Sequence, residues 1–361
     1  MKVLFITANL YPPQAYGGSQ TSTHQLCHGL MRRGHHVAVL TGLISGLIPE
    51  SVLGLAARIS IQINQRFSGC KVSRDTGLGY PVWRIWCPWE VVEYVAKREK
   101  PDLIVVLAFK PVRMALAAKR TGTPILMQLQ DVDFGQHDGD FSALGGIPCI
   151  ANSHFTANTY RRAYGVDPEV IYPFISLERY RTRTSRESVT FINPIPKKGS
   201  DIALELARLC PEIPFTFIEG WRLSFEERQP LTQKLFDLPN LKLLASQSDM
   251  RKVYQRCKIL LTPSICEESY GMVVTEAQAS GIPAVASARG GLRESVGPGG
   301  ILLDPDGPID DWVKSIRRLW NDDQSYAGLS AAASAYAQRP EMALSYQIDA
   351  YERAFLSACG R

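Results

Sequence analysis

Residues 261–286 read LTPSICEESYGMVVTEAQASGIPAVA, and the alternation within this segment indicates the architecture of the whole chain. An apolar run that ends at Pro263 predicts a strand, and a short polar loop follows it. A helix is predicted to begin near Gly271 or Met272, and the next apolar run, at Ala284–Ala286, predicts another strand. Strand, helix and strand in this order are typical of parallel α/β architecture.

Two glutamates lie around the predicted start of this helix. Glu268 precedes it and Glu276 lies within it, a separation on the order of 12 Å at about 1.5 Å per residue. The free amides at a helix start favour an anion, and carboxylates accept hydrogen bonds from sugar hydroxyls. This pattern suits a nucleotide sugar, which carries a hydroxyl-rich group on each side of a diphosphate. The spacing alone also suits two glutamates on an ordinary surface helix.

The same alternation of short β-branched runs and amphipathic stretches occurs twice along the chain. In the first half, strands are predicted at Lys2–Ala8, His36–Thr41, Leu103–Ala108, Pro124–Leu129 and Ile147–Ala151. In the second half, they are predicted at Val189–Asn193, Phe215–Glu219, Leu241–Leu244, Ile259–Pro263 and Ala284–Ala286. We therefore expect an α/β protein with two Rossmann-like domains facing a central cleft, residues 1–180 and 181–340. A last helix, within residues 341–361, could pack back against the first domain.

The composition is that of a soluble globular protein. The chain has 361 residues, of which 45% are hydrophobic and 21% charged, and no apolar run approaches the roughly 18 residues that span a bilayer. Its eight cysteines form no CxxC pair, which fits reduced thiols in the cytosol, and the opening residues, 1–6, are too short an apolar stretch for a signal peptide. We expect a cytoplasmic protein, either free or at the inner face of the membrane.

The charge is uneven along the chain. Residues 1–187 carry 21 Lys and Arg against 14 Asp and Glu, whereas the remainder carries 19 against 21. A basic first domain could contact a membrane surface or a phosphorylated acceptor, or it could simply be a solvated face rich in arginine. The apolar segment Leu43–Arg66 also has two interpretations: it packs in the core, or it forms an interfacial helix that binds the acceptor.

The first loop, Tyr11–Ser19, follows a predicted strand and contains Gly17 and Gly18. Ligands of parallel α/β sheets bind at this position, and glycines let the backbone approach them closely. Ser19 could cap the following helix. The segment is not GxGxxG, which disfavours a dinucleotide, and Gly-Gly by itself also suits a plain turn.

A bound metal is not expected. Three Asp-x-Asp triplets, at residues 131–133, 138–140 and 304–306, could each hold a divalent cation beside a diphosphate, but none follows the strand-end context that such a site needs. The six histidines form no cluster with ligand spacing. We expect no metal ligand and no cofactor other than the substrate itself.

The residues around the two glutamates resemble family 4 of the GT-B-fold glycosyltransferases (glycosyl transferases group 1), a retaining group that uses nucleotide sugars. In that family, a strand ending in Pro-Ser is followed by Glu-x7-Glu and then by Gly-x-Pro. Here these elements are Pro263-Ser264, Glu268 with Glu276, and Gly281-Ile282-Pro283. The likeness extends to Gly17-Gly18 and covers most of the chain.

This resemblance implies roles for particular residues. Glu268 would face the hydroxyls of the transferred sugar, Glu276 the donor ribose, and Lys198 the departing diphosphate. Asp131 would lie on the acceptor side. The implied catalytic residues are Glu268, Lys198 and Asp131. The implied donor-binding residues are Gly17, Gly18, Asn193, Lys198, Glu268, Ser269, Tyr270, Gly271, Met272, Val273 and Glu276.

Two departures from the family pattern bear on these roles. Asn193 stands where the family often has an arginine, so stabilisation of the leaving group would depend more on Lys198. Gln130-Asp131 replaces a frequent His-Asp, and glutamine cannot act as a general base. A non-catalytic nucleotide-sugar-binding relative therefore stays open as an alternative. An epimerase or phosphorylase of the same fold is another alternative. The expected partners are a nucleotide-sugar donor and a glycan, lipid-linked or small-molecule acceptor, without nucleic acid. The nucleobase, the sugar, the acceptor, the linkage and the oligomeric state are not specified.

Overall fold

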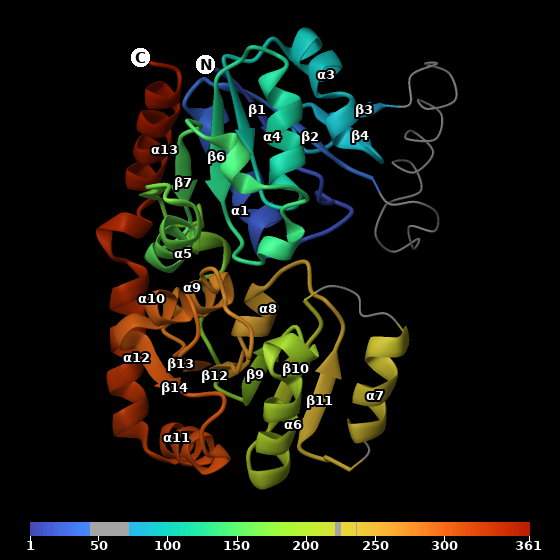
Figure 1. Cartoon of the computed structure of the whole chain (residues 1–361). Coiled ribbons are helices and arrows are strands. Elements are labelled where there is room, and N and C mark those ends of the chain that lie inside the picture. The colour runs from blue at the N-terminus through green and yellow to red at the C-terminus, as the bar shows by residue number, and fades with distance from the viewer. Residues whose placement is uncertain (44–71, 221–224, 236) are drawn as a thin grey trace. The chain divides into compact units, whose positions relative to one another are not determined.

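The computed structural model describes residues 1–43, 72–220, 225–235 and 237–361 (Figure 1). The chain divides into two compact units, one of residues Met1–Phe174 with Leu344–Arg361 and the other of residues Ile175–Ala343. The predicted division was at residue 180. The apolar segment beginning at Leu43 lies, apart from Leu43 itself, outside the described residues.

The first unit is built on an eight-stranded sheet of order β3-β4-β2-β1-β5-β6-β7-β8. Its strands are parallel except for the pair β3 and β4. The strands are β1 Lys2–Ile6, β2 His36–Gly42, β3 Ser73–Asp75, β4 Val82–Ile85, β5 Leu103–Val106, β6 Ile125–Leu129, β7 Cys149–Ala151 and β8 Glu169–Val170. The edge strands β3 and β8 and the neighbouring strand β4 were not predicted, because runs of two to four residues carry too little periodicity to identify a strand.

Helices cover both faces of this sheet, because its central strands are apolar on both sides. Leu4 and Ile6 of β1 pack with residues of α3 and α4, whereas Val3 and Phe5 pack with α1 and α13. The helices are α1 Gly18–Arg32, α3 Val92–Glu99, α4 Pro111–Lys119, α5 His154–Tyr164 and α13 Leu344–Ala358. The C-terminal helix α13 therefore completes the core of the first unit, beside α1 and the sheet (Figure 1).

The second unit contains a six-stranded parallel sheet of order β11-β10-β9-β12-β13-β14. The strands are β9 Ser188–Ile192, β10 Phe215–Ile218, β11 Leu241–Leu244, β12 Cys257–Thr262, β13 Ala284–Ser287 and β14 Gly300–Leu303. The helices are α6 Ser200–Leu209, α7 Phe225–Leu235, α8 Arg251–Tyr254, α9 Met272–Gln278, α10 Leu292–Val296, α11 Ile309–Asn321 and α12 Asp323–Ala337. Two α/β units of Rossmann type confirm the predicted fold class.

The strand order of the second unit identifies where a ligand would bind. The chain builds outward from β9 through β10 to β11, and then returns to place β12 on the other side of β9. Open α/β sheets bind ligands outside the carboxyl ends of their strands at such a reversal. The loops that follow β9 and β12 therefore contain the candidate site.

Among the described residues, no helix has both the length and the apolar character needed to span a membrane.

Candidate functional site

The loops after β9 and β12 are in direct contact. A Cβ atom on Gly199 would lie 1.9 Å from the backbone oxygen of Pro263, and Gly199 has φ +83°, so this position accommodates only glycine without rearrangement. The backbone oxygen of Lys197 accepts hydrogen bonds of 3.2 Å from the amides of Ile265 and Cys266. The short 3-10 helix Pro196–Lys198 is thereby fixed against the end of β12.

This contact brings Lys198 to Glu268. The Lys198 Nζ atom lies 2.5 Å from Glu268 Oε1, and the Ser264 hydroxyl donates to the same oxygen over 2.6 Å. The two charged side chains are 24% and 13% exposed, so both remain within reach of a ligand. An ammonium can bind an anion and a carboxylate can bind hydroxyls, and here the two groups are adjacent. The sequence did not indicate the part of Ser264 in this cluster.

The loop that carries Glu268 is held from the other side by the segment before α10. Gly291 donates its amide to the backbone oxygen of Glu268 over 2.7 Å, and a Cβ atom on Gly290 would lie 2.3 Å from that oxygen. The helix α9 begins at Met272, with Gly271 at its N-cap position and φ +92°. The predicted helix start is therefore correct, and backbone packing fixes the loop between the two glutamates.

Glu276 lies on α9 and is almost completely buried, with 7% of its surface exposed. Tyr254, at the end of α8, donates its hydroxyl to Glu276 Oε2 over 2.7 Å, and Tyr180 provides a second side-chain hydrogen bond. Burial raises the pKa of Glu276 to about 7, and the two phenols offset only part of this rise. This carboxyl group therefore changes its charge near neutral pH.

Two of the predicted donor-binding residues, Tyr270 and Asn193, have side chains that are buried within the second unit. Tyr270 is 1% exposed, and its hydroxyl accepts hydrogen bonds from Thr275 and Arg339, so only its backbone is available to a ligand. Asn193 has φ +67° and is 6% exposed, and no described residue is a partner for its Oδ1 atom. Ser269, by contrast, is partly exposed beside Glu268.

The predicted glycine pair belongs to the first unit. Gly17 is the N-cap residue of α1 and Gly18 its first residue. The expectation that Ser19 caps this helix is wrong, because Ser19 lies within α1 and its hydroxyl donates to Gln130 Oε1 over 2.6 Å. This bond joins the start of α1 to the residue that follows β6.

The loop that leads to the glycine pair is held by one buried arginine. Arg84 is 1% exposed and donates to the backbone oxygens of Tyr11 and Pro12 over 3.2 and 2.6 Å. Its Nε atom donates to Asp75 Oδ2 over 2.7 Å. No sequence pattern identified Arg84, because two of its partners are backbone atoms more than 70 positions away along the chain.

Asp131 and three other aspartates of the triplets, Asp133, Asp140 and Asp304, accept hydrogen bonds from backbone amides of local turns. Asp131 Oδ1 accepts from the amides of Val132 and Asp133 over 2.7 and 3.0 Å. Asp140 and Asp304 each accept a backbone amide from two residues further along. Within the described part of the chain, no group of three or more His, Cys, Asp or Glu side chains is arranged to hold a metal ion.

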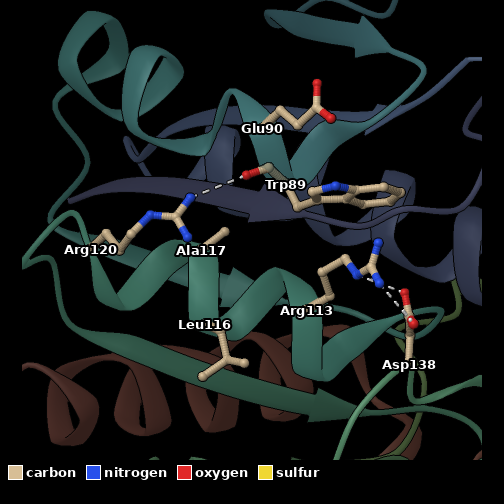
Figure 2. A pocket seen from close by; sticks show the side chains of 7 residues that line it. All are labelled: Trp89, Glu90, Arg113, Leu116, Ala117, Arg120 and Asp138. Atoms are coloured by element: carbon tan, nitrogen blue, oxygen red, sulfur yellow. Dashed lines mark hydrogen bonds and ion pairs between the residues drawn. The ribbon is translucent and has the colours of Figure 1, made fainter.

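A separate pocket of about 430 Å³ lies in the first unit, between α4 and the 3-10 helix Pro88–Glu90. Figure 2 shows its lining residues, Trp89, Glu90, Arg113, Leu116, Ala117, Arg120 and Asp138. Its arginines are already paired: Arg113 Nε lies 2.8 Å from Asp138 Oδ2, and Arg120 Nε lies 2.6 Å from Glu93 Oε1. The Trp89 ring is also covered by the Arg113 guanidinium, 4.9 Å from the ring centroid. Because the arginines of this pocket already form ion pairs with carboxylates, we assign no ligand to it.

Comparison with known proteins gives matches in both units. The family described as Glycosyltransferase Family 4 matches residues 16–179, and the family described as Glycosyl transferases group 1 matches residues 183–336. D-inositol 3-phosphate glycosyltransferases are among the similar proteins. The one from Streptomyces bingchenggensis is 30% identical over 223 residues, which cover 53% of this chain and 49% of that protein. The one from Corynebacterium diphtheriae is 38% identical over 220 residues, 52% of this chain and 51% of that protein. The chain thus spans about half the length of these relatives.

Solved structures share the fold over nearly the whole chain. Anabaena HepE in complex with UDP-glucose superposes with a TM-score of 0.76 at 19% identity, covering 99% of this chain and all of HepE. WaaG, a glycosyltransferase involved in lipopolysaccharide biosynthesis, superposes with a TM-score of 0.67 at 15% identity, covering 98% of this chain and 99% of WaaG. At such low identities the likeness establishes the fold alone. Because the two family matches together take in both Rossmann-like units of this fold, the chain belongs to family 4 of the GT-B-fold glycosyltransferases.

Proposed function

We propose that this protein transfers a sugar from a nucleotide-diphosphate sugar to an acceptor hydroxyl, with retention of anomeric configuration and without a divalent metal. The observation that carries this proposal is the Lys198–Glu268 pair at the strand reversal of the second unit, 2.5 Å apart and open to a ligand. A group that binds hydroxyls and a group that binds phosphate are both needed where a sugar is bonded to a diphosphate.

Different residues would bind the different parts of the nucleotide-sugar donor. Glu268 would accept hydrogen bonds from the hydroxyls of the transferred sugar, and Glu276 from those of the ribose. Lys198 and the backbone amides of Gly271, Met272 and Val273 would neutralise the diphosphate between them. Because Asn193 carries no charge, Lys198 would be the main cation that stabilises the departing diphosphate.

In the transfer step, the bond between the anomeric carbon and the phosphate oxygen breaks. The acceptor hydroxyl attacks from the same face, and its proton passes to the leaving phosphate oxygen. The Glu268 carboxylate, bonded to Ser264 and Lys198 through one oxygen, would orient the sugar rather than attack it. The product would therefore keep the anomeric configuration of the donor.

The comparisons support the donor class and suggest an acceptor class. HepE has been crystallised with UDP-glucose, and several sequence relatives bear the name of D-inositol 3-phosphate glycosyltransferases. We extend these properties to the chain as a proposal: a nucleotide-sugar donor, and an acceptor that is a glycan, a lipid-linked glycan or a phosphorylated small molecule. The excess of basic residues in residues 1–187 favours an anionic acceptor or contact with a membrane surface.

The proposal is tested first by thermal-shift measurements with UDP, GDP, ADP and TDP sugars, followed by turnover of whichever donor binds. Glu268→Gln should abolish most transfer, whereas Glu267→Gln, which changes the adjacent and more exposed glutamate, should not. NMR of the product should show the donor's anomeric configuration, and EDTA should not reduce the rate. An inverted product would exclude retention, and binding without any turnover would favour the non-catalytic relative.

A further inference from the structure

Two buried phenols converge on the carboxylate of Glu276. Tyr254 is 0% exposed and donates to Oε2 over 2.7 Å, while Tyr180, 6% exposed, provides the second hydrogen bond. The two tyrosines come from different parts of the second unit. Tyr254 ends α8, and Tyr180 follows the short 3-10 helix Leu177–Arg179. One carboxylate is therefore oriented by two elements besides its own helix.

Each phenol is held in place by its surroundings. The Ser280 hydroxyl donates to the backbone oxygen of Tyr180 over 3.3 Å and accepts the amide of Thr182 over 2.9 Å, which ties the Tyr180 segment to the residues just after α9. The rings of Tyr180 and Tyr254 meet edge to face, with centroids 6.5 Å apart and planes at 70°. The two phenol groups that donate to Glu276 are therefore held in place before any ligand binds.

The phenols are the polar groups that act on this carboxylate within the described residues. No Lys or Arg there contributes to the pKa of Glu276, which is set by burial, Tyr254 and Tyr180. Tyr254 is itself influenced by the Cys257 thiol, whose pKa burial raises to about 12, so that this thiol stays neutral. The orientation and ionisation of Glu276 thus depend on the two tyrosines.

We propose that Tyr180 and Tyr254 are positioning residues for the donor, which hold the Glu276 carboxylate so that its remaining lone pairs accept the ribose hydroxyls. A carboxylate offers about four lone-pair sites, so two phenol donors leave about two for the two hydroxyls of a ribose. Without the phenols, the buried side chain would be free to change rotamer and would ionise at a higher pH. This inference rests on the proposed function, in which Glu276 binds the ribose.

The test uses the full chain and the nucleoside diphosphate, out of UDP, GDP and ADP, that gives the largest thermal shift with the wild type. Its dissociation constant is measured by calorimetry between pH 5.5 and 8.5 for Tyr254→Phe, Tyr180→Phe and Glu276→Gln. Tyr326→Phe is the matched control, because Tyr326 is another buried tyrosine of the second unit and is not among the groups that set the pKa of Glu276. We expect Tyr254→Phe to weaken binding about tenfold at pH 7.5, as for loss of one hydrogen bond to a charged group.

The pH dependence separates positioning from a merely structural effect. Both Tyr→Phe variants should move the acidic limb of the binding curve to higher pH, because each phenol lowers the pKa of Glu276. In turnover, they should raise KM for the donor and leave kcat nearly unchanged, since the ribose is remote from the bond that breaks. The Tyr326→Phe curve should superpose on that of the wild type.

The outcomes distinguish this inference from the proposed function. If Glu276→Gln weakens binding and both Tyr→Phe variants leave the affinity and the pH limb unchanged, the positioning role is refuted while the donor site stands. If Glu276→Gln itself has no effect, Glu276 does not bind the ribose and the inference fails with it. If no nucleoside diphosphate binds the wild type, the proposed function fails, and the inference falls with it.

Discussion

The buried carboxyl of Glu276 should make the second unit less stable at neutral and alkaline pH than it would be with an uncharged side chain at this position. Its pKa rises from 4.5 to about 7 in the folded protein because burial penalises the charged form. At about 1.4 kcal/mol per pKa unit, this rise corresponds to about 3 kcal/mol of unfolding free energy. Glu276→Gln removes the ionisation and keeps the size of the side chain.

The sign follows from proton binding. Below pH 4.5, the carboxyl is neutral in both the folded and the unfolded state and contributes nothing. Between pH 4.5 and 7, the folded state holds the proton more tightly, so the unfolding free energy falls as the pH rises. Above pH 7, the full penalty of about 3 kcal/mol is present. The Glu276→Gln variant should therefore match the wild type at pH 4.5 and be up to about 3 kcal/mol more stable at pH 8.

Urea denaturation at pH 4.5, 6 and 8, followed by circular dichroism, measures this difference. Glu267→Gln is the control, because Glu267 is about half exposed and should give a difference near zero at every pH. A stabilisation by Glu276→Gln that is equal at all three values would show that the titration of this group is not its cause. No stabilisation at pH 8 would refute the reasoning outright. The stabilised variant should also bind nucleoside diphosphate less well, as expected when a destabilising group serves a function.

Three further substitutions test how the candidate site is supported. Gly199→Ala should destabilise the second unit by about 2 kcal/mol or more and reduce transfer, because its Cβ would lie 1.9 Å from the Pro263 oxygen at φ +83°; urea denaturation with normal stability would contradict the packing. Arg84→Met should cost about 3 kcal/mol and loosen the loop before α1, measured by hydrogen exchange of that loop, since two carbonyls lose their buried donor. Arg228→Ala should cost about 1–3 kcal/mol at pH 7, because Glu219, 2% exposed, loses the guanidinium whose Nε lies 2.8 Å away. Replacing Glu219 by Gln in the same protein should restore much of that loss, and failure to do so would show that the pair is not the cause.

The architecture was predictable from the sequence because its determinants are local. The alternation of apolar runs such as Val189–Asn193 and Phe215–Glu219 with amphipathic stretches identified the central strands of both sheets. The strand–loop–helix pattern at residues 261–278 placed the start of this helix near Gly271 or Met272, and α9 begins at Met272. The short strands β3, β4 and β8 were missed, because runs of two to four residues have no measurable period.

The candidate site was predictable only in part. The resemblance to the family identified Glu268, Glu276 and Lys198 as candidate site residues, and the structure places Lys198 against Glu268. It also shows that Tyr270, expected among the donor-binding residues, packs its side chain inward. A motif lists residues by position, and it does not state which way a side chain points.

The sequence thus specified two Rossmann-like folds and the residue types of a candidate donor site, since periodicity and glycine placement are properties of short segments. Only the tertiary structure decided that one glutamate is open and paired with a lysine, whereas the other is buried beneath two tyrosines. These partners lie 70 residues away in one case and 22 in another, and come from loops and helices that meet only when the strands assemble. Burial and charge pairing depend on every element packed around a group, so the raised pKa of Glu276 and the pairing of Glu268 with Lys198 are properties of the fold.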